Sequence, residues 1–145
     1  GDMPSLKPST ITKLNEHLAK GSCDMATLAS GIKDDTENAN KNIVKVITKD
    51  DIKSSEFSIA TDFVRDPVQD KKLFFYHHIG IYGFTKNALN NFIKLKRSNL
   101  EIRRNLEQMR ALENNMKIDV LYTNSNPLSV DTQADLEEIK NLMEK

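Results

Sequence analysis

The chain has 145 residues, of which 38% are hydrophobic, so its size and composition suit one domain with a single modest core. Lysine plus arginine and aspartate plus glutamate both number 21, and this balance implies no basic surface and argues against nucleic acid as a partner. The sequence lacks an apolar run of about 18 residues and a signal-peptide pattern, which argues against a membrane partner.

The first predicted element is a helix that begins near Pro8. Ile11, Leu14 and Leu18 recur at the spacing of one helical face, and proline suits a first helical turn. Gly21 follows them and suits a helix C-terminus, so the helix is expected to end there.

The next part of the chain predicts two strands separated by loops. Residues 24–30 (DMATLAS) are modestly apolar, and residues 43–48 (IVKVIT) are rich in β-branched side chains, so both are predicted strands. The polar residues 33–42 are expected to form a loop. In residues 49–72 the pattern weakens to one short apolar segment, and a connection of this length in a compact domain is usually functional or mobile. We expect it to form a loop over a binding site.

The longest apolar run, residues 74–84 (FFYHHIGIYGF), predicts a buried central strand that the other elements cover. It is rich in aromatic and β-branched residues and has charged or polar residues on both sides. It also contains two histidines, two glycines and Tyr82, which is more polar chemistry than a core strand needs. We therefore expect this strand to form one wall of a pocket.

Two amphipathic helices are predicted after the central strand, at residues 86–95 and 100–115. The buried side of the second is expected to carry Ile102, Leu106 and Met109, which lie four and three residues apart. A strand at 117–123 and a last helix from Thr132 complete the pattern. Alternating strands and helices favour an α/β fold with a mostly parallel sheet, in one domain over residues 1–145.

Three motifs resemble those of the 3-deoxy-manno-octulosonate cytidylyltransferases, the CMP-Kdo synthetases of lipopolysaccharide assembly. They are HHIGIYGF at 77–84, LEQMRALENNMKI at 106–118 and SVDTQADLEEI at 129–139, in the same order as HIGIYGY, LEQLRALENG-x-x-I and GVDTPEDL in the family. GDMP at 1–4 is similar to the end of the family's QGDEP motif, which lies near the middle of the full-length enzyme. We therefore expect the chain to be the C-terminal half of such an enzyme.

The resemblance implies a fold, a reaction and partners. The fold would be the three-layer α/β fold of the nucleotide-diphospho-sugar transferases, here without its N-terminal nucleotide-binding strands. The reaction would transfer CMP from CTP to the anomeric hydroxyl of Kdo, with Mg²⁺ as cofactor and pyrophosphate as the other product. A homodimer is possible because the family is usually dimeric. We expect the isolated segment to be inactive, since the nucleotide loop lies upstream.

Two aspartates are candidate metal ligands. From the residues alone, Asp131 is better explained as a neighbour of a helix N-cap. The resemblance implies instead that Asp131 and Asp2 hold Mg²⁺ against the CTP phosphates, a role for which two carboxylates suffice. The lone Cys23 cannot form an internal disulfide, and with three scattered histidines it shows no zinc-binding spacing, so a reducing cytoplasmic setting is expected.

Two residues of the central strand are candidate substrate contacts. His77 and His78 are neighbours, and neighbours on a strand point to opposite faces, so they are not expected to bind one ligand. His78 and Tyr82 share a face, with Gly80 leaving room between them. The residues alone allow a hydrogen-bonded core histidine, whereas the resemblance implies that His78 and Tyr82 contact the sugar acid.

Glu107 and Gln108 are the other candidate substrate contacts. On one continuous helix Glu107 lies nearly opposite the buried side, which indicates a solvated residue paired with Arg103 or Arg110. The resemblance implies instead that Glu107 and Gln108 bind the hydroxyl groups of Kdo, which requires the polar face of the helix to look into a cleft.

One departure from the family leaves other functions open. Ile59 stands where the family has an arginine that would pair with the substrate carboxylate. The alternatives are a cytidylyltransferase for a related sugar acid, a non-catalytic binding or dimerisation module, and an inactive remnant.

Overall fold

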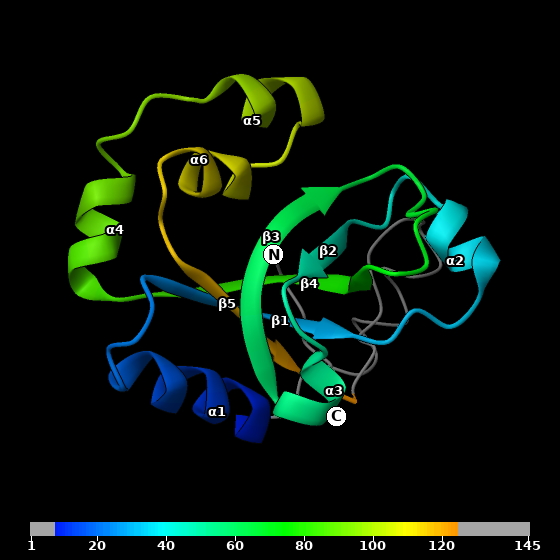
Figure 1. Cartoon of the computed structure of the whole chain (residues 1–145). Coiled ribbons are helices and arrows are strands. Elements are labelled where there is room, and N and C mark those ends of the chain that lie inside the picture. The colour runs from blue at the N-terminus through cyan, green and yellow to red at the C-terminus, as the bar shows by residue number, and fades with distance from the viewer. Residues whose placement is uncertain (1–7, 125–145) are drawn as a thin grey trace, which may run out of the picture.

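The computed structural model describes residues 8–124, whose strands form one mixed sheet that closes on itself (Figure 1). The strand order is β1-β4-β2-β3-β5, and β5 pairs again with β1. The strands are β1 (Met25–Ser30), β2 (Lys45–Thr48), β3 (Phe57–Val64), β4 (Phe74–Phe84) and β5 (Ile118–Tyr122). The α/β class is therefore confirmed for the described part of the chain.

The prediction of a mostly parallel sheet is wrong for the described strands. Only β1 and β5 pair in parallel, and the other four neighbouring pairs are antiparallel. Parallel neighbours need a long crossover connection, which β1 and β5 have because most of the chain lies between them. The connection from β2 to β3, residues 49–56, is too short for a crossover, so this pair is antiparallel.

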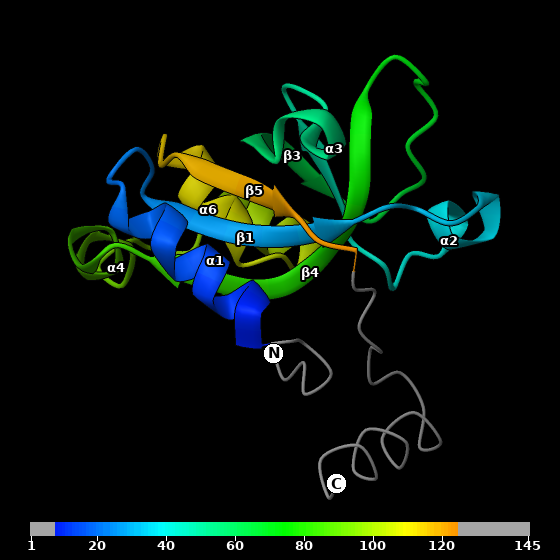
Figure 2. The ribbon, with the colours of Figure 1, turned by 90° about the horizontal axis from the view of Figure 1, so that it is seen from below.

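The central strand is confirmed with the predicted bounds as β4. Its first residues, Phe74 to His77, pair with β2, and its later residues pair with β1. Figure 2 shows the bend that β4 makes between these two halves. The pairing with β1 shifts register between Thr27 and Leu28, which leaves Gly80 and Ile81 of β4 without a partner residue on β1.

The predicted loop at 49–72 is wrong over most of its length. It contains α3 (Ile52–Ser55) and the whole of β3, and the loop is limited to the residues after β3. The inward residues of β3 include Ser58, Ala60 and Phe63, which differ in size and polarity. Because small and polar residues occupy the buried positions, the strand lacks the alternation that identifies a strand in a sequence.

The polar stretch 33–42 also contains a short helix, α2 (Asp35–Ala39), where a loop was predicted. Asp34 is its N-cap and accepts a hydrogen bond from the Glu37 amide at 2.9 Å. The strand predicted at residues 43–48 is confirmed over its last four residues, Lys45–Thr48. That lysine is buried, and the cost of burying its charge is offset by hydrogen bonds that its ammonium donates to the carbonyls of Asn40 and Arg65, at 2.9 and 2.6 Å.

The first helix is confirmed as α1 (Pro8–Ala19), and it crosses β1 and β4 on one face of the sheet (Figure 2). Gly83 permits this packing, because a Cβ at this position would meet the side chain of Leu18. A small apolar cluster lies between this helix and the sheet: Leu14, Cys23, Ala26, Leu28, Ile79 and Leu121. None of the helices in residues 8–124 is both long and apolar enough to cross a membrane.

Three short helices lie on the side of the sheet opposite to α1: α4 (Lys86–Phe92), α5 (Asn99–Arg104) and α6 (Gln108–Glu113) (Figure 1). Their buried residues join the larger core cluster, which includes Met25, Phe63, Phe92, Leu106 and Met109. The two core clusters use alternate residues of the strands, so the sheet separates α1 from these three helices.

Candidate functional site

A pocket of about 220 Å³ lies between β4, the start of β1, α4 and the N-terminus of α6. Its lining residues are mostly apolar or aromatic and come from these four elements: Met25, Tyr82, Phe84, Leu89, Phe92, Ile93, Glu107 and Gln108. We call this space the β4–α6 pocket. It brings together three of the four predicted substrate contacts, which lie up to 26 positions apart in the sequence (from 82 to 108).

The fourth predicted contact, His78, lies behind Tyr82, with 5.4 Å between the two ring centroids. His78 is buried, and its Nε2 lies 2.9 Å from the Thr27 hydroxyl. His77 points to the opposite face, where its Nδ1 lies 2.5 Å from a carboxylate oxygen of Glu37. The prediction that the two histidines serve different faces is confirmed.

The hydrogen bonds around Thr27 assign the state of the His78 ring. The Thr27 hydroxyl lies 2.7 Å from the carbonyl of Ile81 and donates its only proton there, so it accepts from Nε2–H of His78. Burial, followed by the charge of His77, lowers the pKa of His78 to about 3. The ring is therefore neutral near pH 7, and His78 offers hydrogen bonds but no positive charge to a ligand.

The low pKa of His78 predicts acid sensitivity. An unfolded histidine takes up a proton near pH 6.5, whereas folded His78 does so near pH 3, so the unfolded state binds more protons between these values. Stability is therefore fully present above about pH 6.5 and is lost as the pH falls, by about 1 kcal/mol between pH 7 and pH 5.5. Urea unfolding at both pH values should show this loss, and His78→Gln should remove it from the pH dependence. An equal pH dependence in the variant would contradict the assignment.

The predicted helix at 100–115 is wrong as one helix, because the chain breaks it at Asn105. Asn105 has the left-handed conformation (φ 55°, ψ 49°) and caps α5 by donating its amide to the Glu101 carbonyl. Ile102, predicted to be buried, is 58% exposed. Glu107 is exposed, as the wheel predicted, and because α6 starts anew after the break it lies at the edge of the β4–α6 pocket.

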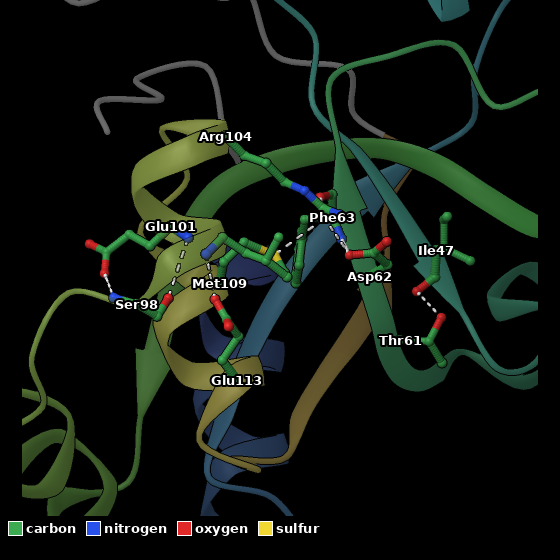
Figure 3. A network of polar contacts seen from close by, with 10 residues as sticks. Ile47, Thr61, Asp62, Phe63, Ser98, Glu101, Arg104, Met109 and Glu113 are labelled. Atoms are coloured by element: carbon green, nitrogen blue, oxygen red, sulfur yellow. Dashed lines mark hydrogen bonds and ion pairs between the residues drawn. The ribbon is translucent and has the colours of Figure 1, made fainter.

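Arg104 fixes the end of α5 against the sheet, as Figure 3 shows. Its Nη1 donates to the Asp62 carboxylate at 2.7 Å and to the Phe63 carbonyl at 2.9 Å, both on β3. Ser98 and Glu101 form a reciprocal capping box at the start of α5. With both ends of α5 held, the short connection to α6 directs Glu107 and Gln108 toward the β4–α6 pocket.

A buried ion pair links α5 to α6 behind the pocket. Glu101 accepts two hydrogen bonds from Arg110, at 2.9 Å from Nε and 2.6 Å from Nη2. These bonds are the main reason that the pKa of Glu101 falls to about 2. The Arg110 guanidinium also lies over the ring of Phe92, 4.8 Å from its centroid, and Phe92 forms part of the pocket wall.

The polar groups of the pocket have no partner among the described residues. Arg110 pairs with Glu101 and not with Glu107, so the predicted surface ion pair of Glu107 does not form in this part of the chain. Gln108 is only 6% exposed, yet its amide makes no hydrogen bond within residues 8–124. Burial, followed by the charge of Glu107, raises the pKa of Tyr82, so its hydroxyl stays protonated. These groups are available to a ligand.

Several functional features escaped sequence reasoning. Leu89 and Ile93 share the apolar face of the predicted helix at 86–95, yet they are 44% and 66% exposed and line the pocket. The supporting roles of Thr27 and Arg110 depend on contacts between distant segments, which periodicity does not reveal. The capping box of Ser98 and Glu101 marks where α5 begins, but the sequence pattern does not show that α5 ends at Arg104.

The remaining predicted site residues are not among the lining residues that the structure describes for this pocket. Asp2 and Asp131, the predicted Mg²⁺ ligands, lie outside the described residues, as does the predicted last helix. Ile59 lies on β3 opposite Asp119. The loop after β3, at 65–73, borders a separate hollow of about 600 Å³ and does not line the β4–α6 pocket, so its place over a binding site stays a prediction.

The chain is similar to known proteins in sequence. Residues 1–118 match the family model described as cytidylyltransferase. A 3-deoxy-manno-octulosonate cytidylyltransferase of Bartonella tribocorum is 40% identical over 147 residues, and one of Sinorhizobium medicae is 41% identical over 143 residues. Both alignments cover 99% of this chain but only 58% and 56% of the relatives, so the chain spans a little over half their length.

A solved structure is also similar to this chain over part of its own length. The structure of a CMP:2-keto-3-deoxy-manno-octonic acid synthetase complexed with CTP superposes with a TM-score of 0.81 and 27% sequence identity. The match covers 99% of this chain and 58% of that chain. The similarity therefore extends to the spatial arrangement of the elements that surround the β4–α6 pocket.

Proposed function

This chain belongs to the cytidylyltransferase family, and on that premise we propose that it forms the sugar-acid side of an enzyme that makes CMP-Kdo from CTP and Kdo. The observation that carries the proposal is the set of unpartnered polar groups of Tyr82, Glu107 and Gln108 in one pocket. Sugar hydroxyls both donate and accept hydrogen bonds, which suits a carboxylate, an amide and a phenol.

The walls of the pocket suit a sugar as well. Phe84 and Phe92 lie side by side with 5.4 Å between ring centroids, and they offer apolar surface to the C–H groups of a sugar ring. No lysine or arginine is among the lining residues that the structure describes, and Glu107 would repel a second carboxylate. We therefore place the hydroxyl-bearing end of Kdo in the pocket, with its carboxylate and anomeric carbon directed outward to the nucleotide.

In the proposed reaction the anomeric oxygen of Kdo attacks the α-phosphorus of CTP, and the bond to pyrophosphate breaks. The residues of the pocket bind and orient the sugar, which raises the effective concentration of the attacking oxygen. We propose Asp2 and Asp131 as ligands of Mg²⁺, which when bound would neutralise phosphate charge. We also propose that nucleotide-binding strands complete a three-layer fold. The enzyme would be a homodimer, as its family usually is, and would act in the cytoplasm, where CTP is made.

The test is Mg²⁺-dependent CMP-Kdo formation by the encoded protein at full length. Asp131→Asn should abolish formation of product, because the ligand loses its charge, while Asp135→Asn on the same segment should retain it. Full activity of Asp131→Asn would contradict the metal role. A folded full-length protein that makes no CMP-Kdo would contradict the proposed substrate.

A second candidate substrate is a related sugar acid. Ile59 replaces the arginine expected for the substrate carboxylate, and the described pocket residues supply no other cation. If a related acid, for example an amino-substituted one, shows the higher kcat/KM in the same assay, this alternative replaces Kdo. If no sugar acid is turned over, the chain is better explained as a binding module or an inactive remnant.

A further inference from the structure

Three residues with metal-binding side chains meet on the α1 side of the sheet, away from the β4–α6 pocket. They are His17 in α1, Cys23 before β1 and Asp119 in β5, and one ligand atom from each lies within 4.8 Å of the others. All three are buried, with 4%, 7% and 1% of their surfaces exposed. The proposed function uses none of them.

The Asp119 carboxylate is incompletely partnered. Its Oδ2 lies 2.7 Å from Nε2 of His17, but its Oδ1 is buried and makes no hydrogen bond in the described part of the chain. The nearest cation is the Lys117 ammonium, 4.0 Å from Oδ1, on a side chain that is 44% exposed. A buried carboxylate oxygen without a hydrogen bond is costly, so this atom points to an absent positive partner.

The chemistry of the three donors restricts the partner. An imidazole nitrogen, a thiolate sulfur and a carboxylate oxygen form a set that suits Zn²⁺, whereas Mg²⁺ and Ca²⁺ prefer oxygen ligands. With a neutral His17, the thiolate of Cys23 and the carboxylate of Asp119 together balance the two charges of the ion.

We propose that His17, Cys23 and Asp119 bind a zinc ion, with water as the fourth ligand. In a tetrahedral zinc site neighbouring ligand atoms lie about 3.3–3.6 Å apart, so the cluster needs shifts of about 1 Å. The His17–Asp119 contact opens slightly, and the ring nitrogen binds the metal instead of the carboxylate. A hollow of about 250 Å³ that His17 lines, beside Phe57, provides a route from solvent.

Zinc binding at this site releases one proton, from the thiol of Cys23. Burial, followed by the charge of Asp119, raises the pKa of the Cys23 thiol to about 11, so without metal the sulfur carries its proton at pH 7. Zinc replaces that proton when the Zn–S bond forms, and the proton goes to solvent. The bound ion would tie α1 to β5 and to the start of β1, and would stabilise the packing of this helix on the sheet.

Cobalt(II) binding to the full-length protein tests the proposal, because Cys23 is the only cysteine of these 145 residues and can be replaced by itself. We expect a thiolate-to-cobalt charge-transfer absorption that saturates at one equivalent, persists in excess Mg²⁺ and disappears when Zn²⁺ is added. The part of this signal that Cys23→Ser removes reports Cys23, so it is independent of any Mg²⁺ at Asp2 and Asp131 and of CMP-Kdo formation.

Variants separate the site from adventitious binding. Cys23→Ser should remove the absorption and weaken zinc binding at least about 100-fold, measured by competition with a chromophoric chelator. His77→Gln, a matched control at a histidine outside the cluster, should retain both. Lys117→Met should strengthen zinc binding, because it removes the cation nearest to Asp119.

Two outcomes would overturn the proposal. One is a folded protein, verified by circular dichroism, that binds cobalt without a thiolate band. The other is zinc affinity that is unchanged in Cys23→Ser. Because Asp119→Asn risks unfolding at a buried position, the decision rests on the near-isosteric Cys23→Ser, whose fold is checked by its melting temperature without metal.

Discussion

We expect Gln108→Leu to lower kcat/KM for the sugar acid roughly 100-fold while leaving the free energy of unfolding nearly unchanged. The Gln108 amide is buried in the β4–α6 pocket and has no hydrogen-bond partner in residues 8–124. Leucine has a similar size and no polar atoms, so the fold loses no hydrogen bond of the described part. A bound sugar instead loses its partner for one or two hydroxyls, which costs about 1–3 kcal/mol.

Steady-state kinetics of the full-length protein, together with urea unfolding, separates these two effects. Gln69→Leu is the matched control, since Gln69 is exposed and lines the separate hollow. It should retain kcat/KM. Should Gln108→Leu be folded and fully active, Gln108 does not contact the sugar and the assignment of the pocket is wrong.

We expect Glu101→Gln to lower the free energy of unfolding by about 2–4 kcal/mol, the largest stability effect among the variants considered. Arg110 would keep its charge on a side chain that is only 15% exposed, with its carboxylate partner removed.

The same ion pair makes the free energy of unfolding depend on pH. Because the pKa of Glu101 is lowered to about 2, the stabilisation is present above about pH 4.5 and is lost as the pH falls toward 2.

Urea unfolding near pH 7 measures this loss, with Glu113→Gln as the control on the exposed side of α6. A double replacement, Glu101→Met with Arg110→Met, should recover part of the stability, because no unpaired charge then remains buried. The single variant should also raise KM for the sugar acid, since Arg110 lies over the pocket residue Phe92. A loss below about 0.5 kcal/mol would show that the pair contributes little.

The local sequence pattern was sufficient to predict an element when the residues of that element alone determine its structure. The bounds of β4, the helix from Pro8 and the opposite directions of His77 and His78 followed from apolar runs, helical spacing and strand alternation. The family resemblance brought Tyr82, Glu107 and Gln108 together as candidates, and the structure places these three around one pocket. Their roles in binding remain predictions.

Tertiary contacts decided the rest. The antiparallel order of the sheet depends on which strands pair, and β3 is a strand because its neighbours on both sides supply hydrogen bonds. Asn105 ends a helix that periodicity continues, since one left-handed residue redirects the chain without changing the apolar spacing. His17, Cys23 and Asp119 show no metal-binding spacing in the sequence, because α1, the segment before β1 and β5 meet only after the sheet has closed.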